Sequence, residues 1–162
     1  MTQRKYKITQ EMKIINGKEL FRIRALRSFS DVRTGDLGGF VQSKHNLSHD
    51  GNCWLYHNSC MLDNSKVSDN SCMYGYSSMY DNSSLHGDSC MYGYSSLHDS
   101  SSMHGKSRIH DQSKLYCSSS LHDNSSMHGK SILSGDRSLR GSDTIQGNSV
   151  LTGYSDEINS RS

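Results

Sequence analysis

Large apolar residues recur at every sixth position through most of the chain, from Leu55 to Leu151, without one insertion. Serine stands two positions before most of them, continuously from Ser59 to Ser131. A turn-forming Gly or Asp stands two positions after nearly all of them, with His57 and Cys117 as exceptions. The apolar series is Leu55, Met61, Val67, Met73, Met79, Leu85, Met91, Leu97, Met103, Ile109, Leu115, Leu121, Met127, Leu133, Leu139, Ile145 and Leu151.

This period of six predicts a β-solenoid. Residues at i and i+2 of a strand point to the same side, so the apolar residue and the Ser before it both face inward. Gly or Asp then follows where the backbone bends and a positive φ is tolerated. The octapeptide SCMYGYSS occurs at residues 71–78 and again at 89–96, eighteen residues later. Three hexads therefore form one coil, and equivalent residues of neighbouring parallel coils should stack about 4.8 Å apart.

The first part of the chain predicts a different element. Asn16-Gly17 lies between two runs of alternating apolar and polar residues, which is the pattern of a type I′ β-hairpin. We expect residues 1–36 to cap the solenoid, because a solenoid end exposes strand edges and an open core. Phe40 and Trp54 are the large residues available to cover that end. The predicted divisions are 1–36 for the cap, 37–156 for the solenoid and 157–162 for a polar tail.

Charge and composition restrict the class of protein. The 162 residues include no Pro and carry a formal net charge of +2, so no strong overall attraction to nucleic acid or a membrane is predicted. Residues 1–36 hold nine Lys/Arg against four Asp/Glu, which a solvated hairpin explains better than nucleic-acid binding. No apolar run approaches the ~20 residues that span a bilayer, and the polar N-terminus does not resemble a secretory signal. The five cysteines have no paired spacing, which favours reduced thiols in a cytoplasmic protein.

The segment TGDLGGFVQSKHNLSHDGNCWLY, followed by hexads such as LHDNSS, resembles bacterial and phage β-solenoid proteins of the YdcK-like, polymer-forming, hexapeptide-repeat type. The resemblance implies a left-handed parallel β-helix, often oligomeric and often of phage or prophage origin. Relatives commonly carry Ala or Val where this chain has Ser or Met. The transferase label of such relatives rests largely on fold, which is a weak basis for assigning an activity.

Outward residues just after each apolar position should form ladders on the three faces. One ladder contains Tyr74 and Tyr92, with Tyr76 and Tyr94 at the adjacent corner. It can serve as a binding surface, as a brace between strands, or as both. Another contains His86, His104 and His122. Histidine is a common metal ligand, but side chains in a flat ladder do not converge on a single ion. Cys72 and Cys90 should also stack within disulfide reach, and a reducing compartment favours free thiols.

These features favour a non-catalytic interaction or scaffold protein that binds another protein or itself through a ladder-bearing face. The candidate binding residues are Tyr74, Tyr76, Tyr92, Tyr94, His86, His104 and His122. No catalytic residue, cofactor, metal site or membrane contact is expected. The alternative is a hexapeptide-repeat acyltransferase of the acetyl-CoA type. The unbroken hexads argue against it, because no inserted loop can enclose an acyl-CoA pocket.

Overall fold

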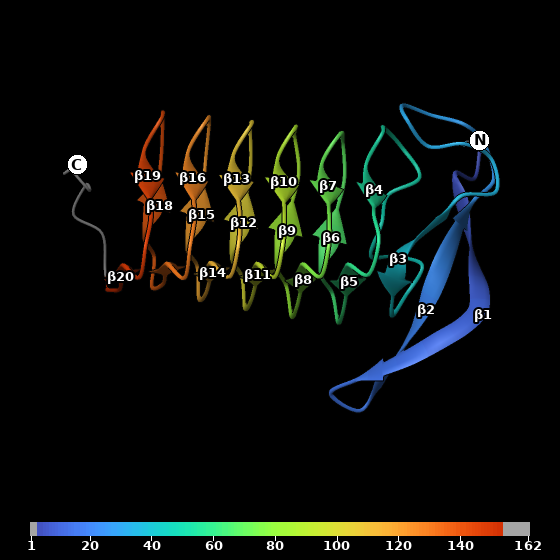
Figure 1. Cartoon of the computed structure of the whole chain (residues 1–162), viewed down its shortest axis with the longest axis horizontal. Coiled ribbons are helices and arrows are strands. Elements are labelled where there is room, and N and C mark those ends of the chain that lie inside the picture. Colours follow the sequence, from blue (N-terminus) through green and yellow to red (C-terminus); the bar gives the residue numbers. More distant parts are fainter. Residues whose placement is uncertain (1–2, 154–162) are drawn as a thin grey trace.

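The computed structural model describes residues 3–153, and over that span every regular element is a β-strand. An N-terminal hairpin of β1 (Tyr6–Ile15) and β2 (Lys18–Ala25) leads into β3 (Leu37–Val41). A stack of triangular coils follows, with the hairpin at one end (Figure 1). Asn16 and Gly17 have φ values of 51° and 75°, so the predicted hairpin turn is confirmed.

Three sheets form the sides of the solenoid. The hairpin and β3 extend the first sheet, so its strands lie in the order β1-β2-β3-β5-β8-β11-β14-β17-β20. Its short strands are β5 (Cys60–Met61), β8 (Ser78–Met79), β11 (Ser96–Leu97), β14 (Lys114–Leu115), β17 (Ile132–Leu133) and β20 (Val150–Leu151).

The other two sides contain coil strands alone. The second sheet consists of β4 (Trp54–Leu55), β7 (Cys72–Met73), β10 (Cys90–Met91), β13 (Arg108–Ile109), β16 (Ser126–Met127) and β19 (Thr144–Ile145). The third consists of β6 (Lys66–Val67), β9 (Ser84–Leu85), β12 (Ser102–Met103), β15 (Ser120–Leu121) and β18 (Ser138–Leu139).

Neighbouring coils pair in parallel and in register. Met91 of β10 lies opposite Met73 of β7 on one side and Ile109 of β13 on the other. Each partner is eighteen residues away, so the predicted coil length and the all-β solenoid are confirmed. Side chains at equivalent positions are therefore repeated at strand spacing, about 4.8 Å, along each face.

The core consists of the apolar residues at period six. Their side chains are fully buried through most of the stack, for example Met91 and Leu97 at 0% exposure. The serines from Ser59 to Ser131 are also buried, at the narrow inner corners. Most of these hydroxyls donate to the carbonyl three residues earlier, as Ser65 does to Leu62 at 2.6 Å. Serine fits there because it is small and supplies its own hydrogen bond to the bend.

Every bend from residue 57 to 153 contains one residue with φ in the left-handed region. Gly or Asp fills nearly all of these positions, and both tolerate that conformation better than other residues. His57 and Cys117, the two exceptions in the sequence pattern, adopt the same conformation with φ of 57° and 60°. The backbone path is thus uniform even where the preferred residue type is absent.

The N-terminal end of the core is closed by aromatic packing. Trp54 is 1% exposed and meets Phe29 edge-on at 5.3 Å between ring centroids. Tyr6 packs against the same indole and donates its hydroxyl hydrogen to the Leu47 carbonyl at 2.8 Å. Lys5 is also buried, and its Nζ donates to the Cys53 carbonyl at 2.8 Å, while burial lowers its pKa.

Phe40 does not cover this end, contrary to the expectation from the sequence. It faces outward from β3 and joins a second buried cluster with Leu20, Cys60 and Leu62. The hairpin bends beneath the first coils and covers these outward residues (Figure 1). The ammonium of Lys13 and the guanidinium of Arg22 lie over the Phe40 ring, 4.0 and 4.3 Å from its centroid. Leu62 is therefore fully buried, although its place in the coil points outward.

The predicted tail, residues 157–162, lies outside the described residues. Across residues 3–153 there is no helix with the length and apolar character needed to cross a bilayer.

Candidate functional site

A column of stacked aromatic rings runs along the second sheet. Tyr56 and Tyr74 stack at 4.5 Å between centroids, and Tyr74 and Tyr92 at 5.0 Å with only 2° between their planes. His110 and His128 continue the column at 4.6 and 4.8 Å. The predicted stacking of Tyr74 on Tyr92 is confirmed, and the rings are held in one orientation by the coils below.

Tyr76 and Tyr94 form a second, more exposed pair at the adjoining corner. Their rings stack at 5.1 Å and 3°, and the two residues are 56% and 63% exposed. Each lies one residue beyond a bend glycine, Gly75 or Gly93, which projects the side chain away from the core. We call Tyr74, Tyr76, Tyr92 and Tyr94 the tyrosine face.

The inner column of the tyrosine face is partly buried and uncharged near neutral pH. Burial is the main cause that raises the pKa of the Tyr74 phenol, with the Cys72 thiol as the next cause. Burial likewise raises the pKa of Tyr92, and Cys90 adds to the effect. At the N-terminal end of the column the Tyr56 hydroxyl donates to the carboxylate of Asp31. The inner pair, Tyr74 and Tyr92, therefore offers rigid rings with neutral hydroxyl groups, the combination that is enriched in protein interfaces.

The third sheet carries the histidine ladder of His86, His104 and His122. His104 meets His86 edge-on at 3.7 Å between centroids and stacks on His122 at 4.9 Å. Serine hydroxyls two residues earlier in the chain contact two of the rings, Ser102 at His104 and Ser120 at His122. Within residues 3–153 no three His, Cys, Asp or Glu side chains are arranged to hold a metal ion. The structure thus brings the three histidines together as a column along the sheet.

A mixed aromatic column lies on the first sheet. His98 stacks between Tyr80 at 4.7 Å and Tyr116 at 4.5 Å. The hairpin partly covers its N-terminal end, where Tyr80 packs against the cluster around Phe40. This column is consequently less accessible than the tyrosine face at the end nearest the cap.

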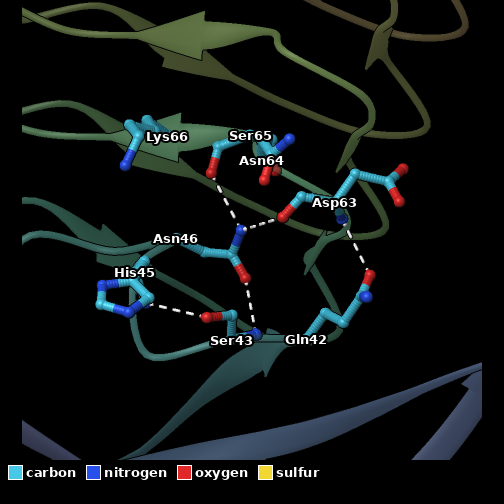
Figure 2. A pocket seen from close by; sticks show the side chains of 8 residues that line it. All are labelled: Gln42, Ser43, His45, Asn46, Asp63, Asn64, Ser65 and Lys66. Carbon is cyan, nitrogen blue, oxygen red and sulfur yellow. Dashed lines mark hydrogen bonds between the residues drawn. The ribbon is translucent and has the colours of Figure 1, made fainter.

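A polar hollow that sequence reasoning missed lies where the chain enters the coils. It has a volume of about 340 Å³ and is shown in Figure 2; it is lined by Gln42, Ser43, His45, Asn46, Asp63, Asn64, Ser65 and Lys66. The only sequence signal was that the segment before Leu55 runs out of register with the hexads.

The lining groups of this hollow mainly hold the backbone. The Asn46 amide group donates to the carbonyls of Asp63 and Ser65 at 3.0 and 2.9 Å. Its Oδ1 accepts from the Ser43 N–H at 2.8 Å, and Gln42 Oε1 accepts from the Asp63 N–H at 2.8 Å. Asn46 therefore replaces the coil contacts that the irregular loop cannot make, which gives the hollow a structural role.

No family model matches the chain. The chain is similar to a protein described as the uncharacterized acetyltransferase YdcK of Escherichia coli (strain K12), with 30% identity over 77 residues. The similarity covers 42% of this chain and 24% of that protein, so the chain spans about a quarter of its length. Together with the solenoid, this similarity fits a hexapeptide-repeat family.

Proposed function

We propose that this chain is a non-catalytic β-solenoid scaffold whose tyrosine face binds protein, either a second copy of the chain or a foreign partner. The observation that carries the proposal is the exposed, stacked pair of Tyr76 and Tyr94 beside the stacked pair of Tyr74 and Tyr92. Aromatic residues in such clusters are frequent anchors of protein interfaces. The family resemblance suggests a phage origin, and for a phage-encoded chain the foreign partner would be a host protein.

The rigidity of the face supports this role. Stacking restricts each ring, and the coils below fix the spacing between them, so little side-chain entropy remains to be lost on binding. Backbone hydrogen bonds between coils hold the strands in place, such as Tyr74 N–H to the Met91 carbonyl at 2.9 Å. A partner would meet a preorganised surface.

The test compares Tyr76→Ser/Tyr94→Ser with the parent and with Tyr116→Ser, which removes a stacked tyrosine from another face. Sedimentation velocity measures self-association, and quantitative binding to any partner identified by affinity capture measures the foreign interaction. We expect at least ten-fold weaker association for the double variant and parental behaviour for Tyr116→Ser, with melting temperatures that stay close. Equal association of all three proteins, or none in the parent, would contradict the proposal.

An acyltransferase remains the second candidate, because the similar E. coli protein bears the name acetyltransferase. Isothermal titration with acetyl-CoA separates the two functions. We expect no saturable heat at micromolar concentrations; saturable binding would favour the acyltransferase instead.

A further inference from the structure

Two cysteines occupy the same outward position on neighbouring coils. Cys72 of β7 lies directly opposite Cys90 of β10, and the Cys72 N–H donates to the Ser89 carbonyl at 3.1 Å. The Cα atoms of such partners are about 4.8 Å apart, within the ~4.4–6.8 Å that a disulfide accepts. Among the described strand pairs, no other places two cysteines opposite each other.

The two thiols also point the same way. Cys72 Sγ lies 3.6 Å from the carbonyl oxygen of Asn70, and Cys90 Sγ lies 3.8 Å from the equivalent oxygen of Asp88. Both residues are only partly buried, so small molecules in solution can reach them. The two side chains are also close enough to hydrogen-bond to each other.

The surroundings make the two thiols chemically unequal. The Cys72 thiol beside Cys90 can donate to its thiolate and is the main cause that lowers the pKa of Cys90 to about 6. Burial opposes this shift. Tyr92 reinforces it, and so does the guanidinium of Arg108, which lies opposite Cys90 on the neighbouring strand β13. The same pairing raises the pKa of Cys72. The pairing therefore favours a state with one thiolate and one thiol over a state with two thiols, and Tyr92 and Arg108 favour the negative charge on Cys90.

The other cysteines lack this arrangement. Burial is the main cause that raises the pKa of both Cys53 and Cys60, which lie under the cap and the hairpin. Cys117 is exposed, but it occupies a bend and meets the hydroxyl of Ser134 at 3.5 Å. Cysteine oxidation follows thiolate character and access, so the Cys72–Cys90 pair is set apart from the rest.

We propose that Cys72 and Cys90 form an oxidisable dithiol that reacts with a hydroperoxide, such as hydrogen peroxide, to give a disulfide between two coils. The Cys90 thiolate attacks one peroxide oxygen, the O–O bond breaks, and the departing hydroxide takes a proton to become water. The Cys72 sulfur then attacks the sulfenic sulfur of Cys90, and the S–S bond forms as the S–O bond breaks. The departing hydroxide takes the Cys72 proton and leaves as a second water. Two electrons pass from the thiols to the peroxide.

The position of this disulfide links it to the neighbouring surface, although its chemistry does not depend on the proposed function. Tyr74 and Tyr92 lie two residues beyond the two cysteines and point outward from the same strands. Oxidation would join the coils that carry the tyrosine face covalently and fix their spacing. A thiol reductant would reverse the change.

The test uses the full chain, treated with a small excess of hydrogen peroxide and then alkylated. Trypsin releases both cysteines in one peptide, 67–106, because no Lys or Arg lies between them. We expect this peptide to lose two hydrogens and resist alkylation, with reversal by dithiothreitol. A further cut before Asp81 should leave the two halves linked. Cys117 in the same digest serves as the internal control and should stay alkylatable.

Two variants test the direction of the chemistry. In Cys72→Ser the new hydroxyl can still donate to the Cys90 thiolate but cannot resolve its sulfenic acid, so dimedone should trap it. In Cys90→Ser the thiolate that Tyr92 and Arg108 favour is absent, so we expect at least ten-fold less trapping at Cys72. Serine suits both positions, because Ser78, Ser84 and Ser102 occupy equivalent outward sites. Absence of the internal disulfide in the parent, or equal trapping in the two variants, would overturn the proposal.

Discussion

The carboxylate of Asp81 accepts a hydrogen bond from the backbone N–H of Asp99, one coil further along, at 3.1 Å. Asp63 does the same for the N–H of Asp81, and Asp99 for that of Cys117. All the acceptors have φ in the left-handed region, and so do the residues whose N–H groups they accept. Each carboxylate thus supplies a partner for an N–H group at the bend of the next coil.

This relationship predicts a graded response at Asp81. Asp81→Asn retains an acceptor oxygen and a residue that tolerates positive φ, so stability should change little. Asp81→Gly loses the bond alone, which we expect to cost about 1 kcal/mol, while Asp81→Ala also forces alanine into the left-handed region and should cost about 2–3 kcal/mol. Denaturant unfolding measures the series. An Ala variant as stable as the Asn variant would contradict this explanation of the bend sequence.

The buried serines are not equivalent, and their differences predict opposite effects of the same substitution. Ser119 Oγ donates to the Tyr116 carbonyl at 2.7 Å and lies 3.1 Å from the Leu133 carbonyl, whereas Ser77 Oγ is buried without a hydrogen-bond partner. Ser119→Ala should destabilise the protein by about 0.5–1.5 kcal/mol, because it removes a satisfied bond. Ser77→Ala should be neutral or stabilising, because it removes an unsatisfied hydroxyl. Thermal melting of the two matched variants compares them, and a loss at Ser77 equal to that at Ser119 would refute the distinction.

The coil stack could be predicted because its determinants are local and repeated. Any one hexad is weak evidence, but Leu55, Leu97 and Leu151 stand in the same phase across 97 residues, and one inserted residue would have broken it. Because residues eighteen apart lie on adjacent coils, the repeat also predicts that Tyr74 stacks on Tyr92. The repeat does not predict the relative orientation of the His86 and His104 rings, because ring rotation depends on local contacts. The planes of these two rings meet at 77°.

The hairpin's docking could not be predicted, because it depends on contacts between segments without a shared period. Phe40 was expected at the end of the core, yet strand alternation in β3 turns Val41 inward and Phe40 outward. The charge pattern predicts solvated cations in the hairpin, but Lys5 is buried and its Nζ donates to the carbonyls of Asp50, Gly51 and Cys53. These positions depend on where the hairpin bends, at a register shift between Ile8 and Met12.

Stability should fall as the pH drops below about 6.5. Burial is the main cause that lowers the pKa of His98, His104, His110 and His122 in the folded chain, with neighbouring histidines or cations adding to it. Below the pKa of an exposed histidine, the unfolded chain therefore binds more protons than the folded chain. The free energy of unfolding is then greatest above that pKa and decreases on acidification.

Urea unfolding between about pH 7.5 and about pH 5 measures this dependence. His104→Gln/His110→Gln should flatten the slope over that range, because two of the four groups no longer take up protons on unfolding. The lowered pKa of Asp63, which Lys18 stabilises by a hydrogen bond, affects stability only at more acidic pH. A slope unchanged in the double variant would show that other groups control the pH response.

The buried thiol of Cys60 reports whether the hairpin is docked on the first coils. Cys60 is 4% exposed and shares a closed cluster with Leu20 of the hairpin, which is 0% exposed. Leu20→Ala should cost about 2–5 kcal/mol of local packing. Two polar contacts near the turn, Lys18 with Asp63 and Lys13 Nζ with the Asn58 carbonyl, would remain but are worth less in solvent. The hairpin should therefore open more often and expose the thiol.

Alkylation of Cys60, followed by peptide mass spectrometry, measures that opening. We expect the rate in Leu20→Ala to rise at least ten-fold, while Met12→Ala, which alters an outward hairpin residue that is 47% exposed, should leave it unchanged. Cys53 is buried under the aromatic residues at the end of the core, where Lys5 Nζ donates to its Sγ and Leu20 plays no part. The alkylation rate of Cys53 should therefore stay low in both variants. Faster alkylation of Cys53 as well would indicate general unfolding, and an unchanged rate at Cys60 would show that Leu20 does not hold the hairpin against the coils.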